Sequence, residues 1–473
     1  MALNAETLSD QGALTLELLQ QTRWIARRVE TVRFLDTSRL ERRITLDLNA
    51  AELKQLATTC GVSATGTVLL PLIVLEKGLL LDLDLTVDGT SRPISTSDAD
   101  SMAATGALVQ TLSKAGVDVK KLPQSVLKTI LNATRTMPGA SDLEVLRVGY
   151  ADVGTVDAWR LVEDPNKSDQ ENEQDAEGWE DLLDANDAFW SLLRNFTASF
   201  MLMTEVKLGE IPEILKIRYV ETQDPPELGF LEKIGLAPYF TLVEAPGVTT
   251  AAREHLRIEA PPGVLLEEAA LWSLDERLTP GQKALPSSGD RTYQRRLTLE
   301  RTALYTAKLP GSSFAVALSM RANPSGFLRR AQYVIGLGFL MILAGAVAQL
   351  AWDTLTDVRR SNADPTVAMM LLVPTLLVAY VAREGDHQVL SDLLRAPRLL
   401  VASTGLVTLA CAGGLVAGVP GAYLCGLWFA SAAWCLVVLV WLRAVNMLSQ
   451  SVIEDVRENQ GTTSILPVTI FQF

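Results

Sequence analysis

Few side chains in this sequence of 473 residues could carry out catalysis or hold a metal ion. There are only two histidines, His255 and His387, so a zinc site built from histidine and cysteine is not expected. The chain contains no HExxH motif, no phosphate-binding Gly-Lys-Ser/Thr loop and no GxSxG motif. We therefore predict no catalytic residue, no metal and no cofactor, while an unrecognised enzyme in the soluble part stays an alternative.

A row of acidic side chains comes closest to a metal-binding pattern. Its members alternate along one expected strand: Asp82, Asp84, Thr86 and Asp88. The spacing resembles the start of an EF-hand calcium loop, yet Val87 stands where that loop needs glycine and Pro93 where it needs glutamate. We therefore interpret the row as the solvated face of a strand and not as a calcium site.

The charge of the chain argues against several kinds of partner. Its formal net charge is −13, and most of the acidic excess precedes residue 331. Such a surface repels the phosphates of nucleic acids and does not favour broad docking on anionic lipid. The four cysteines form no disulfide framework, and the N-terminus lacks the basic and apolar regions of a signal peptide. We expect a cytoplasmic N-terminal part that binds no nucleic acid.

Four apolar stretches in the last third of the chain are long enough to cross a bilayer. None contains Asp, Glu, Lys, Arg or His, and a spanning helix needs about 20 mostly apolar residues. The stretches are residues 331–352, 366–382, 399–419 and 423–442. The sequence therefore predicts an integral membrane protein with a four-helix bundle in residues 324–445, in contact with the lipid bilayer.

Arginines between the apolar stretches predict the orientation of the bundle. Two of them, Arg359 and Arg360, would lie on one side of the membrane. The others would lie on the opposite side: Arg329, Arg330, Arg383, Arg395, Arg398, Arg443 and Arg457. Because basic loops stay in the cytoplasm, we expect a multi-pass protein of the cell (inner) membrane with both termini cytoplasmic.

Small residues recur every four positions on the last two spans, where they let helix backbones approach closely. On the third span they are Ala410, Gly414 and Gly418, and on the fourth Ala422, Gly426 and Ala430. One interpretation is that the two rows pack on each other within a hairpin. The other is that one row forms the subunit contact of a homo-oligomer.

The soluble part predicts an α+β fold in several units. Residues 1–160 combine helix patterns with strands, including an expected hairpin of residues 68–75 and 79–87. Residues 161–196 hold an acidic linker and an amphipathic helix, since residues 163–187 contain 11 acidic residues and one lysine. Residues 197–323 contain short strands separated by turns, which is typical of a β-sandwich beside the membrane. Residues 446–473 are expected to be a cytoplasmic tail.

One loop between the second and third spans is distinctive in its charges. It contains Arg383, Glu384, Asp386 and His387, and it would lie beneath the expected sandwich. We consider it a candidate coupling loop, through which the soluble part contacts the bundle. The alternative is an ordinary polar connection.

Several short segments resemble a set of uncharacterised bacterial membrane proteins of actinobacterial type. They are the turn at residues 87–89, residues 255–263 (HLRIEAPPG), residues 324–329 (PSGFLR) and residues 382–387 (AREGDH). The resemblance covers most of the chain in order but not residues 163–187. It implies a cytoplasmic β-rich region before four membrane helices, and it implies no activity.

The leading functional hypothesis is therefore a non-enzymatic cytoplasmic region that senses or binds a protein partner and is coupled to the membrane bundle. An alternative from another class is an oligomeric effector that forms a pore or disrupts the membrane. A third alternative is the unrecognised enzyme in the soluble part.

Overall fold

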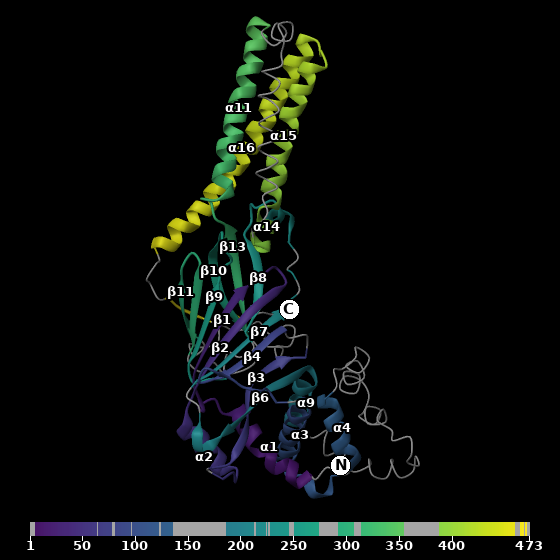
Figure 1. Cartoon of the computed structure of the whole chain (residues 1–473), viewed down its shortest axis with the longest axis vertical. Helices are drawn as coiled ribbons and strands as arrows, with labels where there is room; N and C mark the ends of the chain where they lie inside the picture. Colours follow the sequence, from purple (N-terminus) through teal and green to yellow (C-terminus); the bar gives the residue numbers. More distant parts are fainter. Residues whose placement is uncertain are drawn as a thin grey trace, which may run out of the picture.

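The computed structural model describes most of the chain. The described residues are 5–63, 65–77, 81–95, 97–122, 124–135, 186–211, 214–223, 225, 228–245, 250–273, 292–306, 314–353, 387–458, 464–467 and 469–470. Within them the chain has an α+β arrangement, with sheets and helices first and long apolar helices last (Figure 1). The second expected span, residues 366–382, lies outside the described residues, as do most of the acidic linker and the loop residues Arg383, Glu384 and Asp386.

The largest sheet has nine strands drawn from distant parts of the chain. Their hydrogen-bonded order is β14 (Ser464–Pro467), β11 (Thr292–Leu297), β12 (Arg301–Thr306), β9 (Glu254–Glu259), β1 (Ile25–Phe34), β2 (Arg39–Leu48), β7 (Ile214–Thr222), β4 (Leu81–Val87) and β5 (Thr90–Ser91). Neighbours are antiparallel except β1 and β9, which are parallel. Buried and exposed side chains alternate along β1, β7 and β12, so the sheet has a core face and an outer face.

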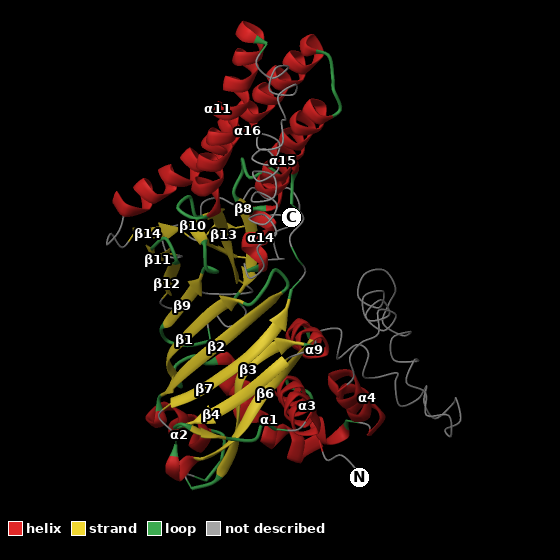
Figure 2. Ribbon diagram, turned by 45° about the horizontal axis from the view of Figure 1, so that its top comes forward, coloured by secondary structure: helices red, strands yellow, loops and turns green. Residues whose placement is uncertain are grey.

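Two smaller sheets cover the core face (Figure 2). One has the order β15 (Thr469–Ile470), β10 (Val264–Ser273), β13 (Phe314–Ala322) and β8 (Tyr239–Glu244), and the other pairs β3 (Thr67–Glu76) with β6 (Ser199–Lys207). Val32 and Leu256 of the large sheet share a core with the four-stranded sheet. Ile44 and Ile217 share a second core with β3 and β6.

Helices cover the far side of the β3–β6 pair, where a third core lies. They are α1 (Ala5–Gln20), α3 (Ser97–Lys114), α4 (Gln124–Arg135) and α9 (Asp187–Ala198), while α2 (Ala50–Thr59) packs on the second core. The start of α2 agrees with its sequence pattern, because the Asn49 side chain accepts a hydrogen bond from the backbone N–H of Glu52.

Three helices at the C-terminal end are long and apolar enough to cross a membrane: α11 (Phe327–Trp352), α15 (Arg395–Val416) and α16 (Gly421–Glu458). They confirm that the first, third and fourth expected spans are long apolar helices. Leu337, Leu406 and Val416 are each about 70% exposed, which suits contact with lipid and would be costly in water. The short helix α14 (Gln388–Leu393) precedes α15.

The strands expected in residues 197–323 are all present, but their partners differ from those of a separate sandwich. β6 pairs with β3, and β7 lies between β2 and β4, so one sheet combines strands from both expected units. The predicted hairpin is wrong for the same reason: β3 and β4 belong to different sheets. Strand patterns depend on local alternation, whereas pairing depends on which faces must be buried together.

The end of the chain also differs from a simple tail. Helix α16 continues well beyond the last apolar stretch, and β14 then pairs with β11 while β15 pairs with β10. Segments that precede the membrane helices in the sequence and segments that follow them therefore pair in the same sheets.

Candidate functional site at the joint between the sheets and the membrane helices

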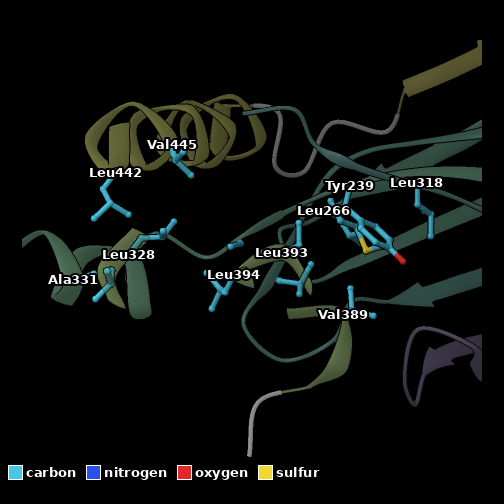
Figure 3. Close-up of a cluster of buried hydrophobic side chains, with 14 of the residues drawn as sticks. Tyr239, Leu266, Leu318, Leu328, Ala331, Val389, Leu393, Leu394, Leu442 and Val445 are labelled. Carbon is cyan, nitrogen blue, oxygen red and sulfur yellow. The ribbon is translucent and has the colours of Figure 1, made fainter. Parts of the chain in front are cut away.

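The sheets and the membrane helices meet in a packed region that we call the joint. It comprises residues 235–237, 321–328, 387–397 and 442–449, with the turn at residues 260–263. Buried side chains from the sheets, such as Tyr239 and Leu318, belong to the same core as Val389 of α14 and Leu328 and Leu442 of the long helices (Figure 3). The apolar core is thus continuous from the β-rich part into the bundle.

His387 is the one described member of the expected coupling loop, and it contacts the sheets. Its Nε2 lies 3.1 Å from the backbone oxygen of Phe34 at the end of β1. Its Nδ1 accepts a hydrogen bond from the backbone N–H of Val389, so the same ring caps the start of α14. One side chain therefore connects the large sheet to the helix that leads into α15.

The turn after β9 provides a second connection. Gly263 has φ of +82°, and a Cβ atom placed there would lie 2.7 Å from a methyl carbon of Leu390 in α14. Only glycine suits both the left-handed backbone and this close approach. Residues 255–263 are one of the segments that carry the resemblance described above. They form most of β9 and the following turn, and this turn lies against the joint.

The remaining connections tie the long helices together at their bases. The guanidinium of Arg398 lies 5.8 Å from the ring centre of Phe327, and the side-chain amide of Gln332 donates to the backbone oxygen of Leu442 at 2.8 Å. Beside them, burial raises the pKa of Tyr239 to about 12, and the nearby carboxylates of Asp392 and Glu232 act in the same direction. A ring that stays neutral suits this apolar setting.

The described residues of the joint enclose little empty space. The cavity between them has a volume of about 10 Å³, which holds at most one water molecule. A larger groove of about 750 Å³ lies at the other end of the soluble part, between β3, β6 and the segment after β4. The described residues of the joint are therefore closely packed.

The six small residues of the last two spans have different surroundings. Gly414 is buried, and a Cβ atom there would lie 2.9 Å from Leu427 of α16, which fits packing within the hairpin. Gly418 has φ of +76° at the end of α15. The other four are exposed: Ala410, Ala422, Gly426 and Ala430. The row on α16 therefore does not pack on α15, and it faces outward.

A buried ionic cluster separates the two cores on the inner face of the large sheet. Arg42 contacts Glu30 at 2.6 Å and Glu221 at 2.5 Å, and Arg28 contacts Glu30 at 2.7 Å. Burial alone would raise the pKa of Glu30, but the two guanidinium groups outweigh it and lower the pKa. Removing one member of a buried pair costs about 3–5 kcal/mol, so we assign this cluster a structural role.

Outside the joint, the outer face of the large sheet carries two side chains of types that could take part in catalysis. His255 of β9 stacks on Tyr305 of β12 with 4.3 Å between ring centres. Burial and the neighbouring Arg257 and Arg27 lower the pKa of His255 to about 4, so the ring is neutral near pH 7. No group of three or more potential metal ligands occurs among the described residues, and Asp84 of the acidic row lies beside Arg218 on this outer face.

Comparisons with protein-family models, curated proteins and solved structures find no match to this chain. Sequence reasoning assigned His387 to the coupling loop but gave Gly263, Arg398 and Gln332 no part in it. The glycine could have been noticed from the Pro-Pro-Gly turn, whereas the other two depend on contacts between distant segments.

Proposed function

We propose that this protein is a membrane-anchored binding protein whose β-rich part receives a partner and transmits the binding to the membrane helices. The observation that carries the proposal is the continuous apolar core across the joint. A rigid connection of this kind lets a change in the sheets alter the packing of the helices, because close-packed cores do not absorb displacement. The role is one of binding and coupling and involves no catalysis.

We further propose four membrane crossings, with the β-rich part and both termini in the cytoplasm. Support comes from the positions of the described ends: α11 leaves the joint and α15 begins again at the joint. An additional crossing between Asp353 and His387 would return the chain, and residues 366–382 are apolar enough to provide it. The arginines at the bases of the helices favour the cytoplasmic side for the joint.

Coupling through the joint can be tested by hydrogen exchange of the full-length protein in lipid nanodiscs. Gly263→Val places a side chain against Leu390, and Gly89→Val is the matched control, because Gly89 also has a positive φ but no atom within 4 Å of the added Cβ position. We expect Gly263→Val to speed exchange by about tenfold in residues 388–397 and at the bases of α15 and α16, whereas Gly89→Val leaves them unchanged.

Leu390→Ala loosens the same contact from the other side and should give the same pattern. It guards against a misfolded Gly263→Val variant. Unchanged exchange in the helices of both joint variants would mean that the two parts behave independently, and the proposal would then be overturned.

The outward row of small residues on α16 favours a second candidate, an oligomer that forms a pore. Such a row permits close contact between copies of the helix. Ion flux through liposomes that contain the purified protein would support this candidate. Tight liposomes together with a responsive joint would support the binding role.

A further inference from the structure

The outer face of the nine-stranded sheet carries a row of arginines that we call the arginine row. It consists of Arg218 of β7, Arg43 of β2, Arg257 of β9 and Arg296 of β11. Register links them directly across the strands: Arg218 opposes Arg43, Arg43 and Arg257 both oppose Thr31, and Arg257 and Arg296 both oppose Ala303. Four residues that lie far apart in the sequence therefore form one line across the sheet.

The arginine row faces solvent. The side chains of Arg43 and Arg218 are more than half exposed, and Arg257 and Arg296 are also exposed. Strands lie about 4.8 Å apart, so the row extends about 24 Å from β7 to β11. The small side chains of Thr31 and Ala303 separate the arginines and leave space between the guanidinium groups.

Within the described part of the chain, two of the arginines pair with a carboxylate and two do not, although the Nε–H of Arg257 donates a hydrogen bond to Nε2 of His255 at 3.2 Å. The buried carboxylate of Glu41 accepts hydrogen bonds from Arg218 at 2.6 Å and from Arg43 at 3.0 Å. Burial would raise the pKa of Glu41, but these bonds outweigh it and lower the pKa, so the carboxylate stays charged. Among the described residues, no carboxylate lies within ion-pair distance of Arg257 or Arg296.

A concentration of positive charge is unusual in a chain whose net charge is −13. We infer that the arginine row binds an extended acidic segment of another polypeptide, a partner class that specifies the proposed binding function and rests on it. Carboxylates suit arginine because both groups are planar and can form paired hydrogen bonds. In a peptide with the polyproline II conformation every third residue lies on the same side and repeats at about 9 Å. That repeat is close to the two-strand distance of about 10 Å from Arg43 to Arg257 and from Arg257 to Arg296.

Other anionic partners fit the geometry less well. A nucleic acid would bring a continuous line of phosphates against Asp47, Glu259 and Asp84, which lie on the same face. An anionic bilayer would meet only one end of the row, since the row runs across the sheet from β11, which is nearer to the long helices, to β7, which is farther from them (Figure 1). A narrow acidic peptide can follow the row and avoid the flanking carboxylates.

The test measures fluorescence anisotropy of a labelled peptide with glutamate at every third residue, added to the full-length protein in nanodiscs. We expect saturable binding that weakens with salt. Arg257→Glu combined with Arg296→Glu should weaken it by about tenfold or more, because two attractions become repulsions. Lys54→Glu combined with Lys128→Glu is the control, since both lysines are exposed on helices away from this face and the net charge changes equally. Arg257→Lys combined with Arg296→Lys should have an intermediate effect, because the charge stays but the paired geometry is lost.

Three outcomes would overturn the inference. They are no binding of the peptide, equal loss in the control variant, or tighter binding of a single-stranded RNA that the row variant abolishes. Absence of peptide binding while Gly263→Val still loosens the helices would reject the arginine row and leave the proposed function in place. If the peptide binds but the joint variants leave the helices unchanged, the proposed coupling would be rejected and peptide binding by the arginine row would stand.

Discussion

At the scale of single residues, Asp100 is the buried acid whose protonation should affect stability. Its side chain lies at the start of α3 and accepts a hydrogen bond from the backbone N–H of Met201 at 2.9 Å. Burial raises the pKa of Asp100 to about 6, although the hydrogen bond from Met201 and the charge of Lys77 act in the opposite direction. The folded chain therefore holds this proton more tightly than the unfolded chain does.

The sign of the pH dependence follows from that shift. The contribution of Asp100 to the free energy of unfolding is fully present below its usual pKa of 3.8 and is lost as the pH rises through about 6. Relative to Asp100→Asn, the wild-type protein should lose up to about 3 kcal/mol between pH 4 and pH 7. Thermal unfolding in detergent, followed by tryptophan fluorescence at constant ionic strength, would measure the difference.

The exposed neighbour Asp98 supplies the control for this experiment, since its side chain is 65% exposed. Asp98→Asn should run nearly parallel to the wild-type protein over the same pH range, because the ion pair that it removes with Arg135 lies on the surface and contributes little to stability. Parallel curves for Asp100→Asn as well would contradict the prediction.

At the scale of elements, the contact between α1 and α3 depends on a pair of glycines. A Cβ atom placed on Gly12 would lie 1.9 Å from the backbone carbon of Gly106, so the two helix backbones touch at this point. The third core surrounds the contact, with Leu8 and Leu108 buried on the two helices. Neither backbone can move away without opening that core.

Gly12→Ala should therefore destabilise the protein by about 1–3 kcal/mol, because overpacking forces the two helices apart. The direction of the change in stability is informative, because replacing glycine by alanine inside a helix otherwise stabilises the helix by about 1 kcal/mol. Gly209→Ala, where the added Cβ meets no atom within 4 Å, should change stability little. Denaturant unfolding of the three proteins would decide, and an unchanged or raised midpoint for Gly12→Ala would show that the contact is looser than described.

At the scale of the whole molecule, the last strands determine which soluble segments lie together. β14 and β15 follow α16, yet they pair with β11 and β10, which precede α11. The chain therefore leaves the β-rich part through α11 and returns to it through α16 (Figure 1). A path that starts and ends on one side of a bilayer crosses it an even number of times.

Labelling of single cysteines in intact cells would test the path, in a variant whose four native cysteines are replaced by alanine. Cysteines at Asp353 and Ala417, at the far ends of α11 and α15, should react with a membrane-impermeant maleimide. A cysteine at Gln450, beyond the apolar part of α16, should react only after the cells are opened. Reaction of the first two positions from opposite sides would exclude the proposed fourth crossing.

The sequence alone determined the class of the fold and the positions of most elements. Strands such as β7 and β9 were recognisable because buried and exposed side chains alternate along each strand by itself. The three described long helices were recognisable because hydrocarbon requires a continuous apolar stretch, whatever the neighbours are. Those signals are local, so no knowledge of the fold was needed to read them.

Only the tertiary structure decided which strands are partners, and thus which residues form a site. The sequence favoured a hairpin of β3 and β4, but the second core requires β3 to pair with β6 and β4 with β7. The connection from His387 to Phe34 and the alignment of Arg43 with Arg257 depend on such pairings over hundreds of residues. Burial of all the apolar faces at once selects these pairings, and no single stretch of the sequence contains that information.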